Sequence, residues 1–115
     1  MSWTVEVSDE FIEWYDALTD DEQESVNAGV DKLEVYGPSL RRPYADTVNG
    51  SAYPNMKELR VQYHGSPYRI LYAFDPRRSA YVILGGDKTG DALWYERNIP
   101  KADAIYAKHL KEIGE

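Results

Sequence analysis

The 115-residue sequence contains no cysteine, which excludes a disulfide framework and a thiolate metal site and suits a reducing compartment. No apolar run approaches the roughly 18 residues that a membrane-spanning helix needs. The first residues lack the basic region and the long apolar stretch of a signal peptide. Internal repeats and low-complexity tracts are also absent. Together these absences predict a soluble cytoplasmic protein that forms one domain over residues 1–115.

Basic residues are scarce in the first third of the chain. The formal net charge is −7, and residues 1–40 carry eleven acidic residues against a single base, Lys32. Residues 41–97 reverse this balance with nine bases and six acids. An acidic helical layer beside a mildly basic sheet can still bind phosphate locally. The simpler interpretation is a solvated helix face with scattered surface charge.

Hydrophobic residues make up 43% of the chain, which is enough for a packed core, and their spacing predicts the N-terminal elements. Residues 3–7 alternate between large apolar and polar side chains and predict a strand. Ser8 is a suitable cap for a helix that follows at once. Thr19-Asp20-Asp21-Glu22 has the spacing of a capping box and begins a second helix, which Gly37-Pro38 ends. These two helices form a hairpin, followed by a long irregular connection over residues 38–55.

The second half of the chain predicts three strands and a helix. The strands cover Met56–Tyr63, Tyr68–Asp75 and Ser79–Leu84, and tight turns join them. Asn98 and Pro100 introduce a C-terminal amphipathic helix. The predicted order is β-α-α-β-β-β-α, an α+β fold with an antiparallel sheet. Because the helices need one sheet face to bury their apolar stripes, we expect the opposite face to be free.

Strand alternation predicts which side chains share that free face. We expect Gln62 to pair with Arg69 in the first hairpin and Phe74 to pair with Ala80 in the second. The apolar face then consists of Leu59, Val61, Ile70, Tyr72, Phe74, Val82 and Leu84. The other face carries Arg60, Gln62, Arg69, Tyr81 and Ile83, with Asp87 and Lys88 at its rim. A register slip of one residue would exchange the two faces.

Two arginines and a lysine on one sheet face repel each other and attract an anion. Phosphate suits them because a guanidinium group binds it through two parallel hydrogen bonds. The alternative is internal pairing of Arg60 and Arg69 with Glu58, with Asp75 or with the acidic helices.

The residues of these strands carry a family resemblance. Met56-Lys57-Glu58-Leu59-Arg60, followed by Tyr68-Arg69-Ile70-Leu71-Tyr72, resembles the paired strands of HigB-like toxins in the RelE/ParE superfamily. Gly85-Gly86-Asp87-Lys88-Thr89 lies where that family has a strand-end segment of the form HGFxKK, although Gly85 and Thr89 replace its histidine and second lysine. The segment from Gly37 to Pro43 is similar to the family's Gly/Pro-Leu-basic segment, and the likeness extends over nearly the whole chain.

This resemblance implies an antiparallel sheet with helices on one side and a toxin that cleaves mRNA, often on the ribosome. It implies no metal or organic cofactor. It also implies a cognate antitoxin as partner, commonly one with a helix-turn-helix DNA-binding domain. Two other functions stay open: a ParE-like toxin that binds DNA gyrase, and a module without catalysis that only binds an antitoxin or another partner.

Metal-free RNA cleavage by attack of a 2′-hydroxyl needs a base, charge stabilisation at phosphorus and an acid for the leaving 5′ oxygen. Arg60 and Arg69 suit the charge stabilisation, and Lys88 assists or serves as the acid. Asp87 is the candidate base, or it neutralises an arginine. The candidate substrate-binding residues are Arg41, Arg42, Lys57, Gln62, Tyr81 and Tyr95, the two tyrosines by stacking or by proton donation. We expect His64 and His109 to be structural or exposed.

Overall fold

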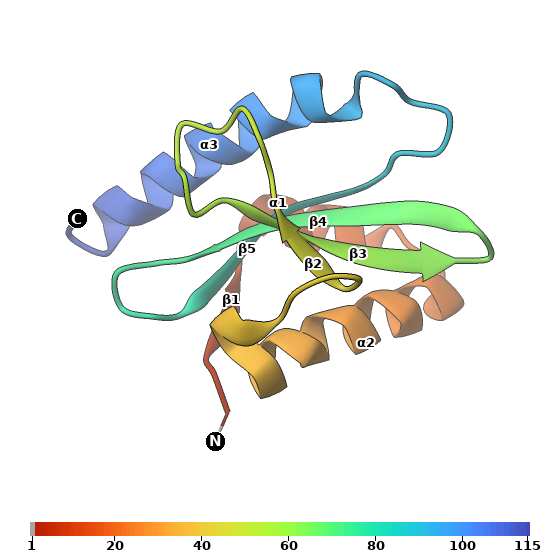
Figure 1. Cartoon of the computed structure of the whole chain (residues 1–115), viewed down its shortest axis with the longest axis horizontal. Coiled ribbons are helices and arrows are strands. Elements are labelled where there is room, and N and C mark those ends of the chain that lie inside the picture. The colour runs from red at the N-terminus through yellow and green to blue at the C-terminus, as the bar shows by residue number, and fades with distance from the viewer. Residues whose placement is uncertain (1) are drawn as a thin grey trace.

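A twisted five-stranded sheet separates two helical layers in the computed structural model, which describes residues 2–115 (Figure 1). The elements in chain order are β1 (Val5–Val7), α1 (Asp9–Asp16), α2 (Asp20–Tyr36), the 3₁₀ turn η1 (Gly37–Ser39), β2 (Ala45–Thr47), β3 (Lys57–Tyr63), β4 (Ser66–Phe74), β5 (Ala80–Asp87) and α3 (Trp94–Glu112). The strand order is β1-β5-β4-β3-β2. All neighbours are antiparallel except β1 and β5, which run parallel.

The predicted α+β class and element order are confirmed, with one strand more than expected. The additional strand β2 lies inside the connection over residues 38–55 and pairs with the first three residues of β3. At three residues it is too short to show a period-two pattern, so no local signal marks it.

The helix boundaries follow the local sequence at three of four places. The Ser8 hydroxyl accepts the Phe11 N–H at 2.9 Å, and the capping box at Thr19 and Glu22 is complete. Helix α2 ends where Gly37 caps it. The φ of 55° at Gly37 lies in the left-handed region that favours glycine, and a Cβ there would overlap the Trp3 ring. The fourth expectation was wrong: α3 begins before Asn98, so Pro100 lies inside the helix rather than in its first turn.

Both faces of the sheet are buried. The core on the side of α1 and α2 contains Phe11, Val26, Leu33, Leu59, Val61, Ile70, Tyr72 and Val82. The core on the side of α3 contains Met56, Leu71, Ala73, Ile83, Trp94, Ile99, Ala102 and Tyr106. The expectation of a free face opposite the helical hairpin was therefore wrong, as was the implied placement of all helices on one side (Figure 1). The reason is visible in β4, where residues 70–74 form a continuous apolar run instead of alternating.

The strand register differs from the expected one in two places. Gln62 pairs with Pro67 and Arg60 with Arg69, a shift of two residues that leaves every side chain on its expected face. The expected pairs of Phe74 with Ala80 and Tyr72 with Val82 are present. A β-bulge then pairs Leu71 with Leu84, so Leu84 packs on the α3 side rather than on the expected apolar face.

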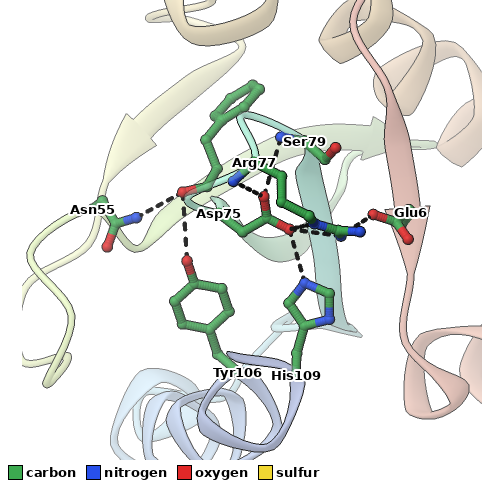
Figure 2. Close-up of polar contacts among 8 residues, drawn as sticks. Glu6, Asn55, Asp75, Arg77, Ser79, Tyr106 and His109 are labelled. Atoms are coloured by element: carbon green, nitrogen blue, oxygen red, sulfur yellow. Dashed lines mark hydrogen bonds and ion pairs between the residues drawn. The ribbon is translucent and has the colours of Figure 1, made fainter. Parts of the chain in front are cut away.

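The buried carboxylate of Asp75 connects α3 to the turn between β4 and β5 (Figure 2). Asp75 Oδ2 lies 2.9 Å from His109 Nε2 and 2.9 Å from Arg77 Nη2, and Arg77 also forms an ion pair with Glu6. The backbone N–H groups of Arg77 and Ser79 donate to Asp75 Oδ1. Burial disfavours the charged form of Asp75, but hydrogen bonds from Arg77, His109 and the backbone outweigh it and hold the pKa of this carboxyl below its ordinary value.

Candidate functional site

Arg60 and Arg69 lie directly opposite each other on β3 and β4, on the sheet face that α3 partly covers. The Arg60 side chain is about one-third exposed and the Arg69 side chain is nearly buried. Their pairing follows from the two-residue turn at His64 and Gly65, both of which have positive φ. The hairpin therefore holds two guanidinium groups side by side near the N-terminal end of α3.

Glu58 lies between the two arginines and is only 3% exposed. Its Oε2 accepts a hydrogen bond from Arg60 Nε at 3.0 Å, and its Oε1 accepts one from the Tyr95 hydroxyl at 2.5 Å. Arg69 Nε lies 3.7 Å from Oε1, which is an ion-pair separation without a hydrogen bond, and this buried nitrogen has no other partner among residues 2–115. The alternative of internal pairing with Glu58 therefore holds fully for Arg60 and only in part for Arg69.

The cluster keeps an excess of positive charge. Asp46 on β2 forms ion pairs with Arg42 at 3.3 Å and with Arg60 at 3.4 Å. The Lys88 ammonium lies 5.7 Å from the centre of the Tyr95 ring. The charged members of the cluster are the cations Arg42, Arg60, Arg69 and Lys88 and the carboxylates Asp46 and Glu58. Four cations against two carboxylates leave two positive charges that are not neutralised within the cluster, which suits a phosphodiester.

Hydrogen bonding in the cluster fixes two protonation states. The hydrogen bond to Glu58 raises the pKa of Arg60, against the opposing effect of burial, so this guanidinium stays charged. Burial and the hydrogen bond to Glu58 raise the pKa of the Tyr95 phenol, and Arg69 opposes this shift. Tyr95 therefore stays protonated at neutral pH and can donate a proton or a hydrogen bond.

Two of the candidate residues lie elsewhere. Asp87 Oδ1 accepts hydrogen bonds from the backbone N–H and the hydroxyl of Thr89, so its carboxylate stabilises the turn after β5. Tyr81 pairs with Ala73, four residues along β4 from Arg69, and its ring stacks on His109 at 3.6 Å. Burial first, and then nearby carboxylates, raise the pKa of Tyr81 to about 12, so its surroundings are acidic rather than cationic.

The other candidates lie at different places relative to the arginines. Lys57 begins β3 and pairs with Tyr72, and because it is three residues from Arg60, strand alternation places its side chain on the opposite face of the sheet, so the structure does not bring it to the arginines as predicted. Gln62 is exposed and lines an open groove of about 620 Å³ together with Arg60 and Arg69. Arg41 and Arg42 lie in the connection before β2 and line an adjoining groove, which shares Lys32 and Tyr44 with the first.

Glu58 and Asp46 are the residues of this cluster that the sequence interpretation does not include as site members. Glu58 lies two positions before Arg60, so strand alternation already places the two side chains on one face. On the sequence alone it figures only as a competitor for the arginines. The absent strand-end histidine also has a structural reason: a Cβ at Gly85 would overlap the ring of Trp14, on the side of the helical hairpin.

No helix in the described part of the chain is both long and apolar enough to cross a membrane. Among residues 2–115, no three His, Cys, Asp or Glu side chains are grouped in a way that holds a metal ion.

Known structures share this fold. The chain superposes on a mutant of the Escherichia coli toxin RelE in the free state with a TM-score of 0.60 and 12% sequence identity, over 96% of this chain and 99% of that one. It also superposes on an archaeal RelE–RelB complex from Pyrococcus horikoshii OT3 with a TM-score of 0.57 and 17% identity, over 80% and 100% of the two chains. The fold is therefore RelE-like.

Sequence comparison gives nearer relatives. A protein of Mycobacterium tuberculosis named "Putative toxin HigB3" is 52% identical over 91 residues, which cover 78% of each chain. A second protein from the same organism, "Putative toxin HigB2", is 41% identical over the whole of this chain, which spans 58% of that protein's length. The family described as Phage derived protein Gp49-like (DUF891) matches residues 13–107. The chain thus belongs to the Gp49-like family and to the family of these HigB-like toxins, and its fold is RelE-like.

Proposed function

We propose that this protein is the toxin of a type II toxin–antitoxin system and that it arrests translation by cleaving mRNA in the cytoplasm. The observation that carries the proposal is the pair of opposed arginines, Arg60 and Arg69, in a cluster with a surplus of positive charge beside Tyr95 and Lys88. The names of the two mycobacterial relatives support a toxin.

The proposed reaction is transesterification without a metal or organic cofactor. The 2′ oxygen forms a bond to the adjacent phosphorus, and the bond from phosphorus to the 5′ oxygen breaks. The 2′ proton goes to a base, and the leaving 5′ oxygen receives a proton from an acid. Arg60 and Arg69 stabilise the charge that develops on the phosphoryl oxygens, because fixed guanidinium donors need no reorganisation in the transition state.

The acid and base are assigned by position. Lys88 and Tyr95 lie at one side of the arginine pair and are the candidate acids. Asp87 was the base expected from sequence, but its Oδ1 is engaged by Thr89. Glu58 is the carboxylate in contact with the arginines, and a substrate phosphate that takes over its hydrogen bond from Arg60 would free it to accept the 2′ proton.

The proposed partner is an antitoxin with a helix-turn-helix domain. Two structures with this fold are complexes of RelE with RelB, from E. coli and from P. horikoshii. Cleavage on the ribosome is also part of the proposal, since a net charge of −7 slows the encounter with free RNA, although a local basic site can still hold a strand.

Internal pairing favours a second candidate function. Because Glu58 and Asp46 already engage Arg60, the cluster is also consistent with a toxin that acts only by binding, such as a ParE-like gyrase toxin. Induction of the chain without an antitoxin in bacteria separates the two. RNA cleavage predicts translation arrest and new mRNA ends, whereas gyrase binding predicts a DNA-damage response with intact mRNA.

The variants for this test separate the geometry of the two arginines from their charge. Arg60→Lys with Arg69→Lys keeps both charges but removes the paired guanidinium geometry, and the double alanine variant removes both charges. Arg78→Ala, at the turn beside Trp3, is the matched control because it removes an arginine outside the cluster. We expect growth arrest with the wild type and the control and its loss in both double variants. Full arrest by the double alanine variant would show that the site is assigned wrongly.

A further inference from the structure

We propose that a groove at the C-terminal end of α2 binds the single-stranded RNA next to the scissile phosphate. This proposal rests on the proposed function, and it adds a subsite that requires the RNA to be single-stranded. The groove has a volume of about 530 Å³ and is lined by Lys32, Tyr36, Ser39, Leu40, Arg41, Arg42 and Tyr44. Its volume lies within the roughly 300–1,000 Å³ of ligand clefts.

The charge of this groove is opposite to that of the helical layer around it. Three of its seven lining residues are cations, Lys32, Arg41 and Arg42, and none is acidic. Lys32 is the single base among residues 1–40, which carry eleven acids, and it lies in this groove. The Arg42 side chain is 76% exposed, so most of it is accessible to a ligand although it also contacts Asp46. Local cation density of this kind attracts a phosphate backbone.

Two exposed tyrosines provide aromatic surfaces in the same groove. Tyr36 is 54% exposed and Tyr44 is 48% exposed, although folded proteins usually bury most of the surface of such large aromatic side chains. The Lys32 ammonium lies over one face of the Tyr44 ring, 4.9 Å from its centre, so a base that stacks on this ring takes the other face and has a cation near its phosphate. Alternation of aromatic rings and cations is the pattern that binds single strands, because each unpaired base offers a flat face.

The groove is continuous with the arginine cluster. The adjoining groove of about 620 Å³ shares Lys32 and Tyr44 with it and extends to Arg60 and Arg69. The backbone N–H of Arg60 donates to the Tyr44 carbonyl at 2.8 Å, which fixes the ring's segment against β3. A strand of RNA held at the arginines therefore has a direct path over Tyr44 to Tyr36.

Local structure holds the groove in place without a ligand. Lys32 and Tyr36 are four residues apart on α2 and share one helix face. The Ser39 hydroxyl donates to the Tyr36 carbonyl at 2.6 Å, and Leu40 is buried beneath the segment. The backbone of the groove therefore needs little rearrangement when a strand binds.

The observations favour RNA over an acidic peptide as the occupant. A peptide would satisfy the three cations, but it would not explain two half-exposed phenol rings beside them. Duplex RNA does not fit either, since its bases are stacked inside the helix and cannot reach Tyr36 or Tyr44.

The test measures binding of the full chain to a short single-stranded RNA that is fully 2′-O-methylated and so cannot be cleaved. We expect Tyr36→Ala with Tyr44→Ala to weaken binding by about 30-fold or more, and the double phenylalanine variant to bind as the wild type does. Arg41→Gln with Arg42→Gln should weaken binding and reduce the dependence of log K on log salt by about 1.4. Val35→Ser is the control, because Val35 is 62% exposed on the same helix but does not line the groove.

Three results would overturn the groove assignment: normal RNA binding by the double alanine variant, equal affinity of the wild type for duplex RNA, or tighter binding of a polyglutamate peptide than of RNA. Because the RNA is uncleavable, the outcome is independent of catalysis. Loss of binding in the tyrosine variant together with no cleavage by the wild type would retain the groove and refute the nuclease. Cleavage by the wild type together with unchanged binding in the tyrosine variant would retain the nuclease and refute the groove.

Discussion

Replacement of Asp75 by asparagine removes the charge at the centre of the network in Figure 2 and keeps the size of the side chain. The carbonyl oxygen of the new side chain can still accept the two backbone hydrogen bonds. Its amide NH₂ group, however, stands where Asp75 Oδ2 accepts from Arg77 and from His109, both at 2.9 Å. The Arg77 guanidinium then faces a donor, and His109 can contact the amide only through its other tautomer, as an acceptor without a charged partner.

The expected loss follows from the exposure of each partner. His109 is 6% exposed, so the loss of its hydrogen bond to a charged acceptor costs about 1.5–3 kcal/mol. The Arg77 side chain is 44% exposed, so water screens this ion pair and its loss costs less than about 1 kcal/mol. We expect a total loss of about 3 kcal/mol and a decrease in Tm of roughly 10 °C for a domain of this size.

Thermal and urea unfolding at pH 7 measure this loss. Asp103→Asn is the matched control, because Asp103 accepts hydrogen bonds from Ser51 and Ala52 at a partly exposed position and should cost about 1 kcal/mol or less. A decrease of less than about 1 kcal/mol in the free energy of unfolding of Asp75→Asn would refute the reasoning, since removal of a buried, paired carboxylate should cost more than that.

The same carboxyl gives an acid dependence with a defined sign. The pKa of Asp75 is lower in the folded protein than in the unfolded chain, where it is about 3.9. Its stabilisation is therefore complete above that value and is lost as the pH falls through the folded-state pKa. The difference in stability between the wild type and Asp75→Asn should be constant at neutral pH and should shrink below about pH 4.

Three further substitutions test separate parts of the account. Gly85→His restores the family's residue but places its side chain against Trp14, so it should reduce the free energy of unfolding by about 1–3 kcal/mol without a gain in activity. Ser8→Ala removes the cap of α1 and a buried hydrogen bond to the Ile83 carbonyl, with an expected loss of about 2 kcal/mol by denaturant unfolding. Glu58→Gln removes a negative charge between the arginines, so the uncleavable RNA should bind several-fold more tightly while cleavage falls by a factor of about 100 or more. Unchanged cleavage by this last variant would exclude Glu58 as the base.

Local signals in the sequence predicted much of the fold. Ser8 and Thr19 cap the helices as their spacing indicates, and alternation along β3 and β4 places Arg60 and Arg69 on one face even though the register differs by two residues. These features depend on neighbours in the chain, so they can be predicted from one sequence.

Features that depend on distant contacts could not be predicted in this way. The bulge at Leu71 and Tyr72 changes the face of Leu84, and no local pattern marks it. Helix α3 covers the face that was expected to be free, because Leu71, Ala73 and Ile83 need a partner there. The central position of Glu58 results from Tyr95 approaching from α3, which again only the tertiary structure shows.

The measurement that tests the central claim most directly is the chemistry of the RNA ends produced by the purified protein. An mRNA is incubated with the wild type and with the Arg60→Lys, Arg69→Lys double variant, in a translation reaction with ribosomes and in parallel without them. The account predicts fragments with 2′,3′-cyclic phosphate and 5′-hydroxyl ends from the wild type and a loss of at least about 100-fold in the variant. Intact mRNA with the wild type in both reactions, or equal cleavage by a folded variant, would contradict it.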